Sequence, residues 1–328
     1  MVAVAAPVRV GVLGCAGIAW RRVLPAFAES AAATVVAVAS RDHEKARRFA
    51  DRFGCAPVTG YAALLAREDV DAVYLPLPTG LHAHWAAEAL RAGKHVLAEK
   101  PLATSASQAA ELIALAGERD LRLMENRMFA CHTQHDAVRK LIADGELGEL
   151  RAMHAVMAIP PLPAGDPRYR ADLGGGALLD VGFYPVHAAL LLLSEPFEVL
   201  GADLHVHEEY GVDVRGAVLL RDGNGVTAHL TFGFEHSYRT AYELTGSKGR
   251  LVLERAFTPP QSWNPVLRIE TSNRVEHRTL PASHQFLSSI DAFAAAVRDG
   301  VPLHGHLQTT LRGLDIMDAV RAVGEGKP

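Results

Sequence analysis

The chain has 328 residues, of which 49% are hydrophobic and 21% are charged, and its net charge is −4. This length suffices for two domains, and the composition is that of an ordinary globular protein with no global positive field to recruit nucleic acid. Three cysteines are too few, and odd in number, for a disulfide scaffold, which favours a reducing compartment and predicts a cytoplasmic protein.

Neither a secretory nor a membrane segment is expected. The N-terminus has no basic region and only a short apolar run, so it does not resemble a signal peptide. No run of about 18 apolar residues occurs, so no membrane span is predicted.

The first 124 residues alternate between strand and helix patterns. Alternation of this kind predicts a doubly wound parallel sheet of the Rossmann type, in a dinucleotide-binding domain over residues 1–124. Strands are expected over 8–13, 34–39, 71–75, 95–98 and 121–124, and helices from Trp20 and over 42–53, 61–66, 81–92 and 105–118.

The turn after the first strand carries a glycine fingerprint. Gly14, Ala16 and Ala19 have the spacing of G-x-G-x-x-G, with alanine at two sites. Gly14 would make the tight turn, a small residue at 16 would admit a pyrophosphate, and the helix N-terminus would bind it. Small-residue turns also serve packing alone, but the position after the first strand favours dinucleotide binding.

The end of the second strand indicates which dinucleotide. An enzyme specific for NAD uses an acidic residue there for the ribose hydroxyls, whereas this chain has Ser40-Arg41. A hydroxyl and a guanidinium suit a 2′-phosphate, which favours NADP(H). Asp42 is better interpreted as a helix N-cap. Arg21 and Arg22 are either anion contacts or solvated helix charges.

Lys100 follows the predicted strand 95–98 in the sequence Glu99-Lys100-Pro101. Ligands of open α/β sheets bind at the carboxyl ends of the strands, so Lys100 is placed to touch a polar substrate. The alternative is a lysine on a solvated loop. Pro78 ends the preceding strand at the same edge, and His82 has either a structural role or a role beside the nicotinamide.

After Met124 the alternation stops, and short strands predict a second domain over residues 125–328. This domain should be α+β, with an open, mainly antiparallel sheet and two closing helices. Cys131, His132 and His135 lack a second ligand pair, so no metal site is predicted. Strands are expected over 150–159, 198–207, 216–221, 226–233, 239–245, 250–254, 266–271 and 275–280, and helices from 133 to about 144, over 283–298 and over 307–323.

Three glycines precede an apolar helix that contains Asp180, Tyr184 and His187. Their spacing predicts one helical face, and Pro185 should kink or break the helix. The three polar residues either form a site or are satisfied within the core. Converging titratable groups favour a site.

The chain resembles the glucose–fructose oxidoreductase, inositol dehydrogenase and MocA family of NAD(P)-dependent oxidoreductases. The resemblance rests on the Gly14 turn, on Glu99-Lys100-Pro101 and on Gly174-Gly-Gly-Ala-Leu-Leu-Asp180-x-Gly-x-Tyr184. It implies a catalytic Lys100, a substrate-lining helix at Asp180, a cis Lys100–Pro101 bond and homo-oligomers built through the open sheet.

Tyr184 stands where many dehydrogenating members of the family have histidine. This tyrosine, with Arg168-Tyr-Arg and Trp20-Arg21-Arg22, is similar to the C-3 ketoreductases of deoxysugar biosynthesis, which reduce dTDP-linked keto sugars with NADPH. The expected partner is therefore a small nucleotide-sugar, with no nucleic acid or membrane. The alternatives are a dehydrogenase of a free sugar, inositol or diol, and a non-catalytic sensor of the same fold.

The predicted site has three parts. Lys100, Tyr184 and Asp180 are the expected catalytic residues. Phosphate contacts from Lys248, Arg250 or Arg255, and base stacking on Trp263 or Phe257, are guesses from residue type. The expected cofactor contacts are Gly14, Cys15, Ala16, Gly17, Ile18, Arg21, Ser40, Arg41, Pro78, His82, Glu99, Lys100 and Arg168.

Overall fold

The computed structural model describes residues 6–324. The chain forms two compact units, and each is described by itself. The N-terminal unit runs to Met128 and also contains Phe286–Leu311, whereas the C-terminal unit contains Phe129–Gln285 and the chain from Arg312 onward.

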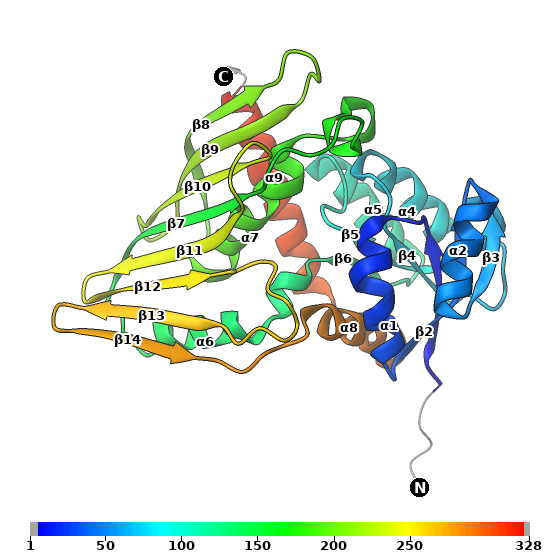
Figure 1. Ribbon diagram of the computed structural model, residues 1–328, viewed down its shortest axis with the longest axis horizontal. Coiled ribbons are helices and arrows are strands. Elements are labelled where there is room, and N and C mark those ends of the chain that lie inside the picture. The colour runs from blue at the N-terminus through cyan, green and yellow to red at the C-terminus, as the bar shows by residue number, and fades with distance from the viewer. Residues whose placement is uncertain (1–5, 325–328) are drawn as a thin grey trace, which may run out of the picture. The chain divides into compact units, whose positions relative to one another are not determined.

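The N-terminal unit is built on a parallel six-stranded sheet with the order β3-β2-β1-β4-β5-β6 (Figure 1). The order reverses between β1 and β4, and the carboxyl ends beside such a switch point are where dinucleotides bind. The predicted doubly wound sheet is confirmed. The edge strand β3 was not predicted, because it is short, half-exposed and contains Pro57. The strands are β1 (Val8–Leu13), β2 (Ala33–Ser40), β3 (Ala56–Thr59), β4 (Ala72–Leu75), β5 (His95–Glu99) and β6 (Leu123–Asn126).

Helices cover both faces of this sheet. Val10 and Val12 pack with α1, α2 and α8, whereas Gly11 points to the other face and lies against Leu64 of α3. The two predicted N-caps, Asp42 and Ser105, are confirmed. The side chain of each accepts a backbone N–H at the start of its helix. The helices are the π-helical η1 (Ala19–Val23), α1 (Leu24–Glu29), α2 (His43–Phe53), α3 (Tyr61–Leu65), η2 (Thr79–Leu81), α4 (His82–Arg91), α5 (Ala106–Glu118) and α8 (Gln285–Asp299).

The C-terminal unit is built on an eight-stranded sheet with the order β14-β13-β12-β11-β7-β10-β9-β8 (Figure 1). Every neighbouring pair is antiparallel except β7 and β10, which run parallel. The open, mainly antiparallel sheet is therefore confirmed. The strands are β7 (Leu150–Ala158), β8 (Glu198–Val206), β9 (Asp213–Arg221), β10 (Thr227–Gly233), β11 (Arg239–Gly246), β12 (Gly249–Glu254), β13 (Val266–Thr271) and β14 (Arg274–Thr279).

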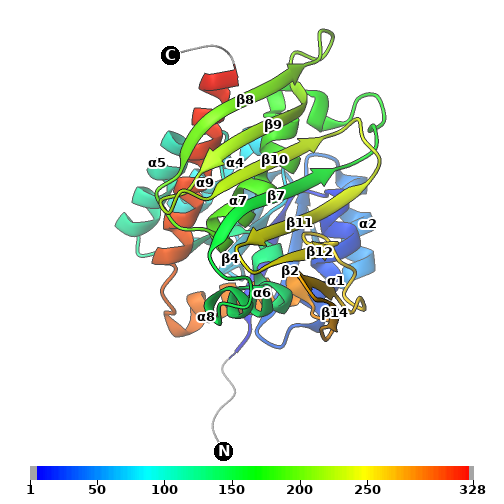
Figure 2. The same ribbon diagram turned by 90° about the vertical axis from the view of Figure 1, so that its left-hand side faces the viewer.

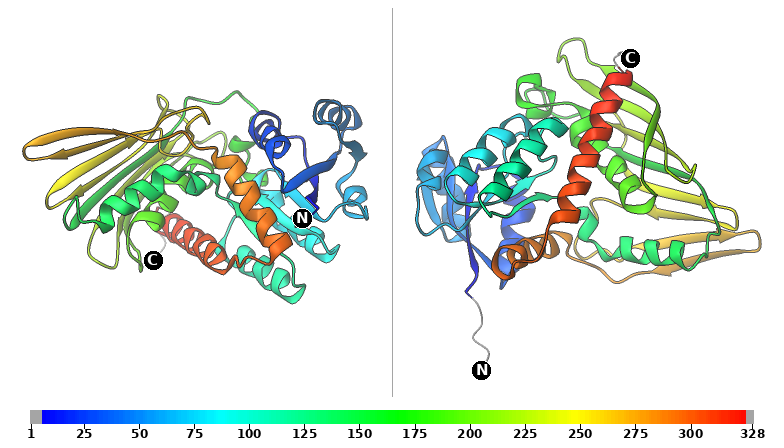
Figure 3. Two further views of the ribbon diagram at one scale, coloured as in Figure 1. Left: turned by 90° about the horizontal axis from the view of Figure 1, so that it is seen from below. Right: turned by 180° about the vertical axis from the view of Figure 1, so that it is seen from behind.

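One face of this sheet is covered by helices, and the other is open (Figures 2 and 3). Met153, Leu230 and Leu244 point to the covered face and are buried, while their neighbours His154 and His229 point outward and are exposed. The remaining helices are η3 (Met128–Cys131), α6 (Thr133–Ala143), η4 (Pro167–Tyr169), η5 (Ala171–Leu173), the π-helical η6 (Leu178–Gly182), α7 (Phe183–Leu192) and α9 (His304–Gly324), which is divided between the two units.

One helical stretch, Ala171–Leu192, is long and apolar enough to cross a membrane by length and composition alone. Polar residues interrupt the apolar runs of this stretch, so it contains no run of about 18 apolar residues. Its most apolar window is 78% buried, which is typical of the core helix of a globular protein.

Gly11 provides a test of packing in the N-terminal unit. A Cβ atom there would lie 2.6 Å from Cδ2 of the buried Leu64, so Gly11→Ala should lower the free energy of unfolding by about 1–3 kcal/mol. Gly117→Ala is the matched control, because Gly117 is exposed on α5 with open space around it. This second change should stabilise the protein by about 0.5–1 kcal/mol. Denaturant unfolding with a common slope measures both, and equal effects would contradict the packing.

Candidate active site

The turn after β1 fits a pyrophosphate. Gly14 has a φ of 122°, and its N–H donates to the carbonyl of Ala39 at 3.0 Å. A Cβ atom at Gly14 would lie 2.7 Å from a side-chain carbon of Leu77, so only glycine fits. Cys15, Ala16, Gly17 and Ile18 form the turn and the start of the helix. The N-terminus of that helix therefore directs unpaired N–H groups at this turn.

Arg21 lies at the same turn. A Cβ atom on Gly17 would stand 2.9 Å from Nη1 of Arg21, so the guanidinium folds back over Gly17. Burial raises the pKa of the Cys15 thiol to about 11, so that side chain is a neutral packing group beneath the turn. Arg21 is thus the charged residue that η1 brings to the predicted pyrophosphate.

The end of β2 brings Ser40 and Arg41 to the corner predicted for the 2′-phosphate. The Ser40 hydroxyl accepts the N–H of Asp42 at 3.1 Å, and Arg41 is exposed. Tyr61, the first residue of α3, belongs to the same corner, because the Arg41 charge acts on its hydroxyl. Burial raises the pKa of Tyr61, while the Arg41 charge partly offsets that rise. The sequence analysis did not include Tyr61, because it follows the missed strand β3.

The Lys100–Pro101 bond is cis, as the family resemblance implied. His82 is buried beside this loop, with Nδ1 2.8 Å from the carbonyl of Pro101 and Nε2 2.7 Å from the carbonyl of Leu77. Burial lowers the pKa of His82, while the contacts with the two carbonyls act in the opposite direction. His82 therefore ties the loop that contains Pro78 to the loop that contains Lys100.

In the C-terminal unit, Arg168 and Asp180 form an ion pair. Nε of Arg168 donates to Asp180 at 2.6 Å, and Nη1 donates to Asp166 at 3.3 Å. The Asp180 carboxylate raises the pKa of Arg168 above its usual range. Arg168, which is expected to contact the cofactor, is thus held by Asp180, which is expected to be catalytic.

Tyr184 lies in an aromatic cluster on α7. Its ring is 6% exposed and packs against Phe129 and Phe257, with centroid distances of 5.6 and 5.5 Å. The cluster fixes the plane of the phenol ring. His187, expected on the same polar face, is a core residue that packs on Phe183.

Pro185 does not break the helix, so of the two predicted outcomes, a kink or a break, the break is wrong. It is the third residue of α7, directly after the π-helical turn η6. The regular ladder of hydrogen bonds is already interrupted there, so the chain tolerates a residue without an N–H.

The structure corrects one sequence-based guess about the nucleotide and gives the contacts of three other residues. Phe257 is fully buried, so it cannot stack on a base. Arg250 pairs with Glu243 and Glu270 on the sheet. The Arg255 guanidinium lies 4.9 Å from the ring centroid of Trp263, which leaves Trp263 and Arg255 as a coupled surface pair.

Two histidines of the Cys131 segment have structural contacts. The Nδ1 atom of His132 accepts the N–H of Gln134 at the start of α6, and His135 lies 3.0 Å from the Tyr242 hydroxyl. Among residues 6–324, no group of three or more His, Cys, Asp or Glu side chains could hold a metal ion.

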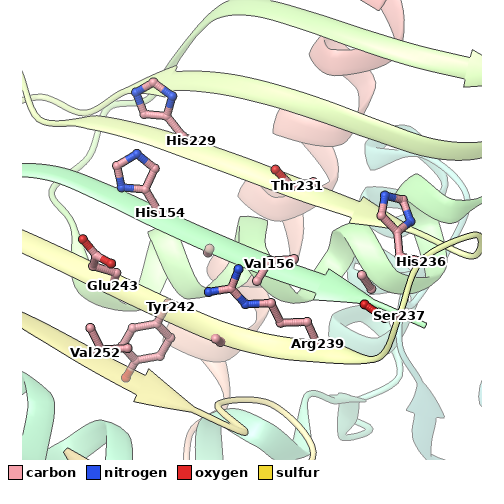
Figure 4. A pocket seen from close by; sticks show the side chains of 13 residues that line it. His154, Val156, His229, Thr231, His236, Ser237, Arg239, Tyr242, Glu243 and Val252 are labelled. Atoms are coloured by element: carbon pink, nitrogen blue, oxygen red, sulfur yellow. The ribbon is translucent and has the colours of Figure 1, made fainter. Parts of the chain in front are cut away.

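A groove of about 440 Å³ lies on the open face of the eight-stranded sheet (Figure 4). His154 and His229 stack there at 4.8 Å between ring centroids, and Thr231, Arg239 and Glu243 lie beside them. This is the face opposite to the helix of Tyr184, so the groove is separate from the predicted substrate residues of the unit.

Comparison with known proteins decides the family. Residues 8–127 match the model of the oxidoreductase family with the NAD-binding Rossmann fold, and residues 135–252 match the GFO/IDH/MocA C-terminal domain. The chain belongs to this family. The family predicted from the sequence is therefore confirmed.

Two relatives share the same name, dTDP-3,4-didehydro-2,6-dideoxy-alpha-D-glucose 3-reductase. The protein from Saccharopolyspora spinosa is 56% identical over 90% of this chain and 89% of its own. The one from Actinomadura kijaniata is 53% identical over 96% and 95%. A D-xylose 1-dehydrogenase (NADP(+)) from Haloferax volcanii is 35% identical over 88% and 89%.

A solved structure of a 3-ketoreductase from Actinomadura kijaniata, in complex with NADP and TDP-benzene, matches with a TM-score of 0.95. It is 52% identical, and the match covers 97% of this chain and 98% of that one. Other structures of that enzyme carry a tyrosine-to-phenylalanine change, or a lysine replaced by alanine or by glutamate.

The 2′-phosphate corner yields a test. NADPH should bind more tightly than NADH, and Arg41→Ala should weaken NADPH binding by about 10- to 100-fold, because a charged hydrogen bond is worth about 1.5–3 kcal/mol. NADH binding should hardly change. Arg119→Ala, at an exposed arginine at the end of α5, is the control and should leave the preference in place. Fluorescence titration measures the dissociation constants. Equal constants for both cofactors in the unaltered protein would contradict the assignment of Ser40 and Arg41.

Proposed function

We propose that this chain is an NADPH-dependent reductase of the C-3 ketone of a dTDP-linked deoxysugar, in the biosynthesis of a sugar such as those attached to antibiotics. The observation that carries the proposal is the end-to-end match to two dTDP-sugar 3-reductases at 56% and 53% identity. The Gly14 turn, which a Cβ atom would block, fits the dinucleotide. The cofactor supplies the hydride when bound.

The catalytic roles follow from the chemistry of ketone reduction, which adds a hydride to carbon and a proton to oxygen. A tyrosine with an ordinary pKa near 10 is protonated at neutral pH and ready to donate. We assign this proton to the Tyr184 hydroxyl, and we assign polarisation of the carbonyl to the Lys100 ammonium. Asp180, paired with Arg168, lines the substrate. In support, the altered lysine and tyrosine of the relative are as far apart in sequence as Lys100 and Tyr184.

We further propose how the chain is divided into domains and how it assembles. Residues 1–124 bind the dinucleotide, and residues 125–328 bind the sugar and mediate oligomerisation. The protein acts in the cytoplasm as a homo-oligomer that uses the open face of the eight-stranded sheet. Exposed Val266 and Val275 on β13 and β14 support this use, because large exposed apolar side chains in one area mark contact surfaces.

An assay of hydride transfer tests the function. The dTDP-linked 3-keto sugar should oxidise NADPH only when the protein is present. Free sugars, inositol and a UDP-linked sugar are the comparison substrates. Faster oxidation of a free sugar with NADP⁺ would favour the alternative, a sugar dehydrogenase like the D-xylose relative. Binding without turnover would favour a sensor.

Tyr184→Phe tests the proton donor, since it keeps the ring in its aromatic cluster and deletes the hydroxyl. We expect kcat to fall by about 10²- to 10⁴-fold, the usual contribution of a general acid, with NADPH affinity unchanged. Tyr238→Phe is the control, because Tyr238 is exposed in the same unit. A loss smaller than about threefold would move the acid role to Lys100.

Thr231→Lys tests assembly through the open face. Thr231 is exposed at the groove on β10, and a charge placed there without a partner should disfavour burial of the face. Light scattering after size-exclusion chromatography should show an oligomer for the unaltered protein and a smaller species for the variant. Ala114→Lys, on exposed α5, is the control. An unchanged oligomer with Thr231→Lys would contradict this use of the face.

A further inference from the structure

The helix that carries Asp180 and Tyr184, η6 followed by α7, begins without a cap of its own, and we call it the site helix. Ala177, which precedes it, has no side chain that could accept an N–H. The first N–H groups of a helix have no partner within it, and a buried one is costly to leave unpaired. Leu178, the first residue of η6, is fully buried. Its N–H therefore needs an acceptor from another element.

That acceptor is the carboxylate of Asp213, the first residue of β9. Its Oδ2 atom accepts the N–H of Leu178 at 2.6 Å, across 35 residues of sequence. Because η6 packs against β9 and β10, the contact ties the start of the site helix to the eight-stranded sheet. A negative charge at this end of a helix is also favoured by the helix dipole. Asp213 thus caps the site helix from outside it.

The three glycines before the site helix make room for this contact. Gly176 has a φ of 121°, and a Cβ atom there would collide with Oδ1 of Asp213. The N–H groups of all three glycines donate to backbone carbonyls of the segment 168–171, at 2.9–3.0 Å. The glycines therefore fold the chain back on itself. They hold the backbone of Arg168 close to the start of the helix that carries its partner, Asp180.

Directional contacts matter for this helix because it is buried nearly all round. Eight of the ten residues of α7 are buried. A helix at the surface is oriented by its apolar stripe, but a helix buried on all sides has no such stripe. Hydrogen bonds depend on angle as well as on distance, so they single out one rotation. The contact of Asp213 with Leu178 and the ion pair of Arg168 with Asp180 are two such bonds in the first turn of the site helix.

A small rotation of the site helix would displace the proposed proton donor. A helix with its side chains is about 5–6 Å in radius, so a turn of about 10° moves a side-chain tip by about 1 Å. A misplacement of that size can slow an enzyme about 100-fold. Tyr184 follows Leu178 on one continuous helix, so its hydroxyl moves with the helix start.

We infer that Asp213 is a positioning residue for the reaction, because it fixes the rotation of the site helix and with it the placement of the Tyr184 hydroxyl. The inference rests on the proposed function, in which Tyr184 donates the proton. A capping side chain in place of Ala177 would satisfy the N–H of Leu178 equally well. Such a local cap would not connect the helix to the sheet, which the carboxylate of Asp213 does.

Asp213→Ala removes the acceptor, and we expect kcat to fall about 10- to 100-fold with NADPH affinity within about twofold. Asp213→Asn keeps an oxygen that can accept from Leu178, so its kcat should stay within about threefold of the unaltered enzyme. An asparagine variant as slow as the alanine variant would overturn the inference, since the acceptor oxygen would then be present without effect.

Asp222→Ala is the matched control. Asp222 is another buried aspartate of the same unit, and it accepts the N–H of Ser194, which lies beyond the other end of α7. Its loss should lower the free energy of unfolding and leave kcat within about twofold. Rates are referred to the folded fraction, measured by near-ultraviolet circular dichroism. Equal losses of kcat for Asp213→Ala and Asp222→Ala would contradict a specific role of Asp213.

Combination with Tyr184→Phe separates positioning from stability. If Asp213 acts through the Tyr184 hydroxyl, Asp213→Ala should cost less than about threefold in kcat once that hydroxyl is absent. An equal loss in both backgrounds would overturn the inference, since a merely structural residue would act in that way. If Tyr184→Phe alone keeps its kcat, the proposed proton donor fails. If it is slow while the two losses multiply, only the positioning role fails.

Hydrogen exchange of the unaltered protein keeps the test independent of turnover and of how the variants fold. Mass spectrometry with electron-transfer fragmentation resolves single amides. The Leu178 amide should exchange as slowly as the amides within α7, because Asp213 accepts its N–H. Exchange at the rate of an unprotected amide would mean that the contact is not formed, and the inference would fail.

Discussion

The N-terminal unit depends on the enclosure of Glu125 at the carboxyl end of a parallel strand. No water reaches this carboxylate, and its partners come from the loop after β5, from Arg127 and from α9. Removing it would take away the carboxylate that lies 3.1 Å from the buried Arg127 guanidinium, and breaking a buried ion pair in this way is costly. An apolar residue pair would hold the same elements together at least as well. The charged pair of Glu125 and Arg127 is therefore better explained by the placement of the loop after β5 than by a gain in stability.

Much of the fold is readable from the sequence because local patterns decide it. The apolar runs of β1 and β13 give their observed ends, and Asp42 and Ser105 cap helices as expected. Other features depend on contacts that local patterns do not contain. The strand β3 is edge-placed and carries a proline, and the parallel pairing of β7 with β10 joins segments separated by two other strands.

The candidate site likewise contains some residues that the sequence predicts and others that it does not. Gly14, Ser40 and Arg41 are recognisable because their positions after strands have a meaning in this fold. Partners far along the chain are not. Thr310 contacts Glu125 across 185 residues of sequence, and Ser289 contacts Asn126 across 163. Tyr61 was missed because a strand was missed. Arg168 is expected at the cofactor, but no sequence pattern shows that the carboxylate of Asp180 holds it.

The two π-helical turns, η1 and η6, contain the predicted ligand residues Arg21 and Asp180, respectively. A π-turn is a single wider turn that accommodates one extra residue within an α-helix. Each residue of an α-helix turns the chain by about 100°. Removal of that one residue would rotate everything before the turn relative to everything after it, so Asp180 and Tyr184 could no longer keep their present angular relation. In an alignment of relatives, a one-residue gap in either turn would therefore signal a rebuilt site, even where every named side chain is present.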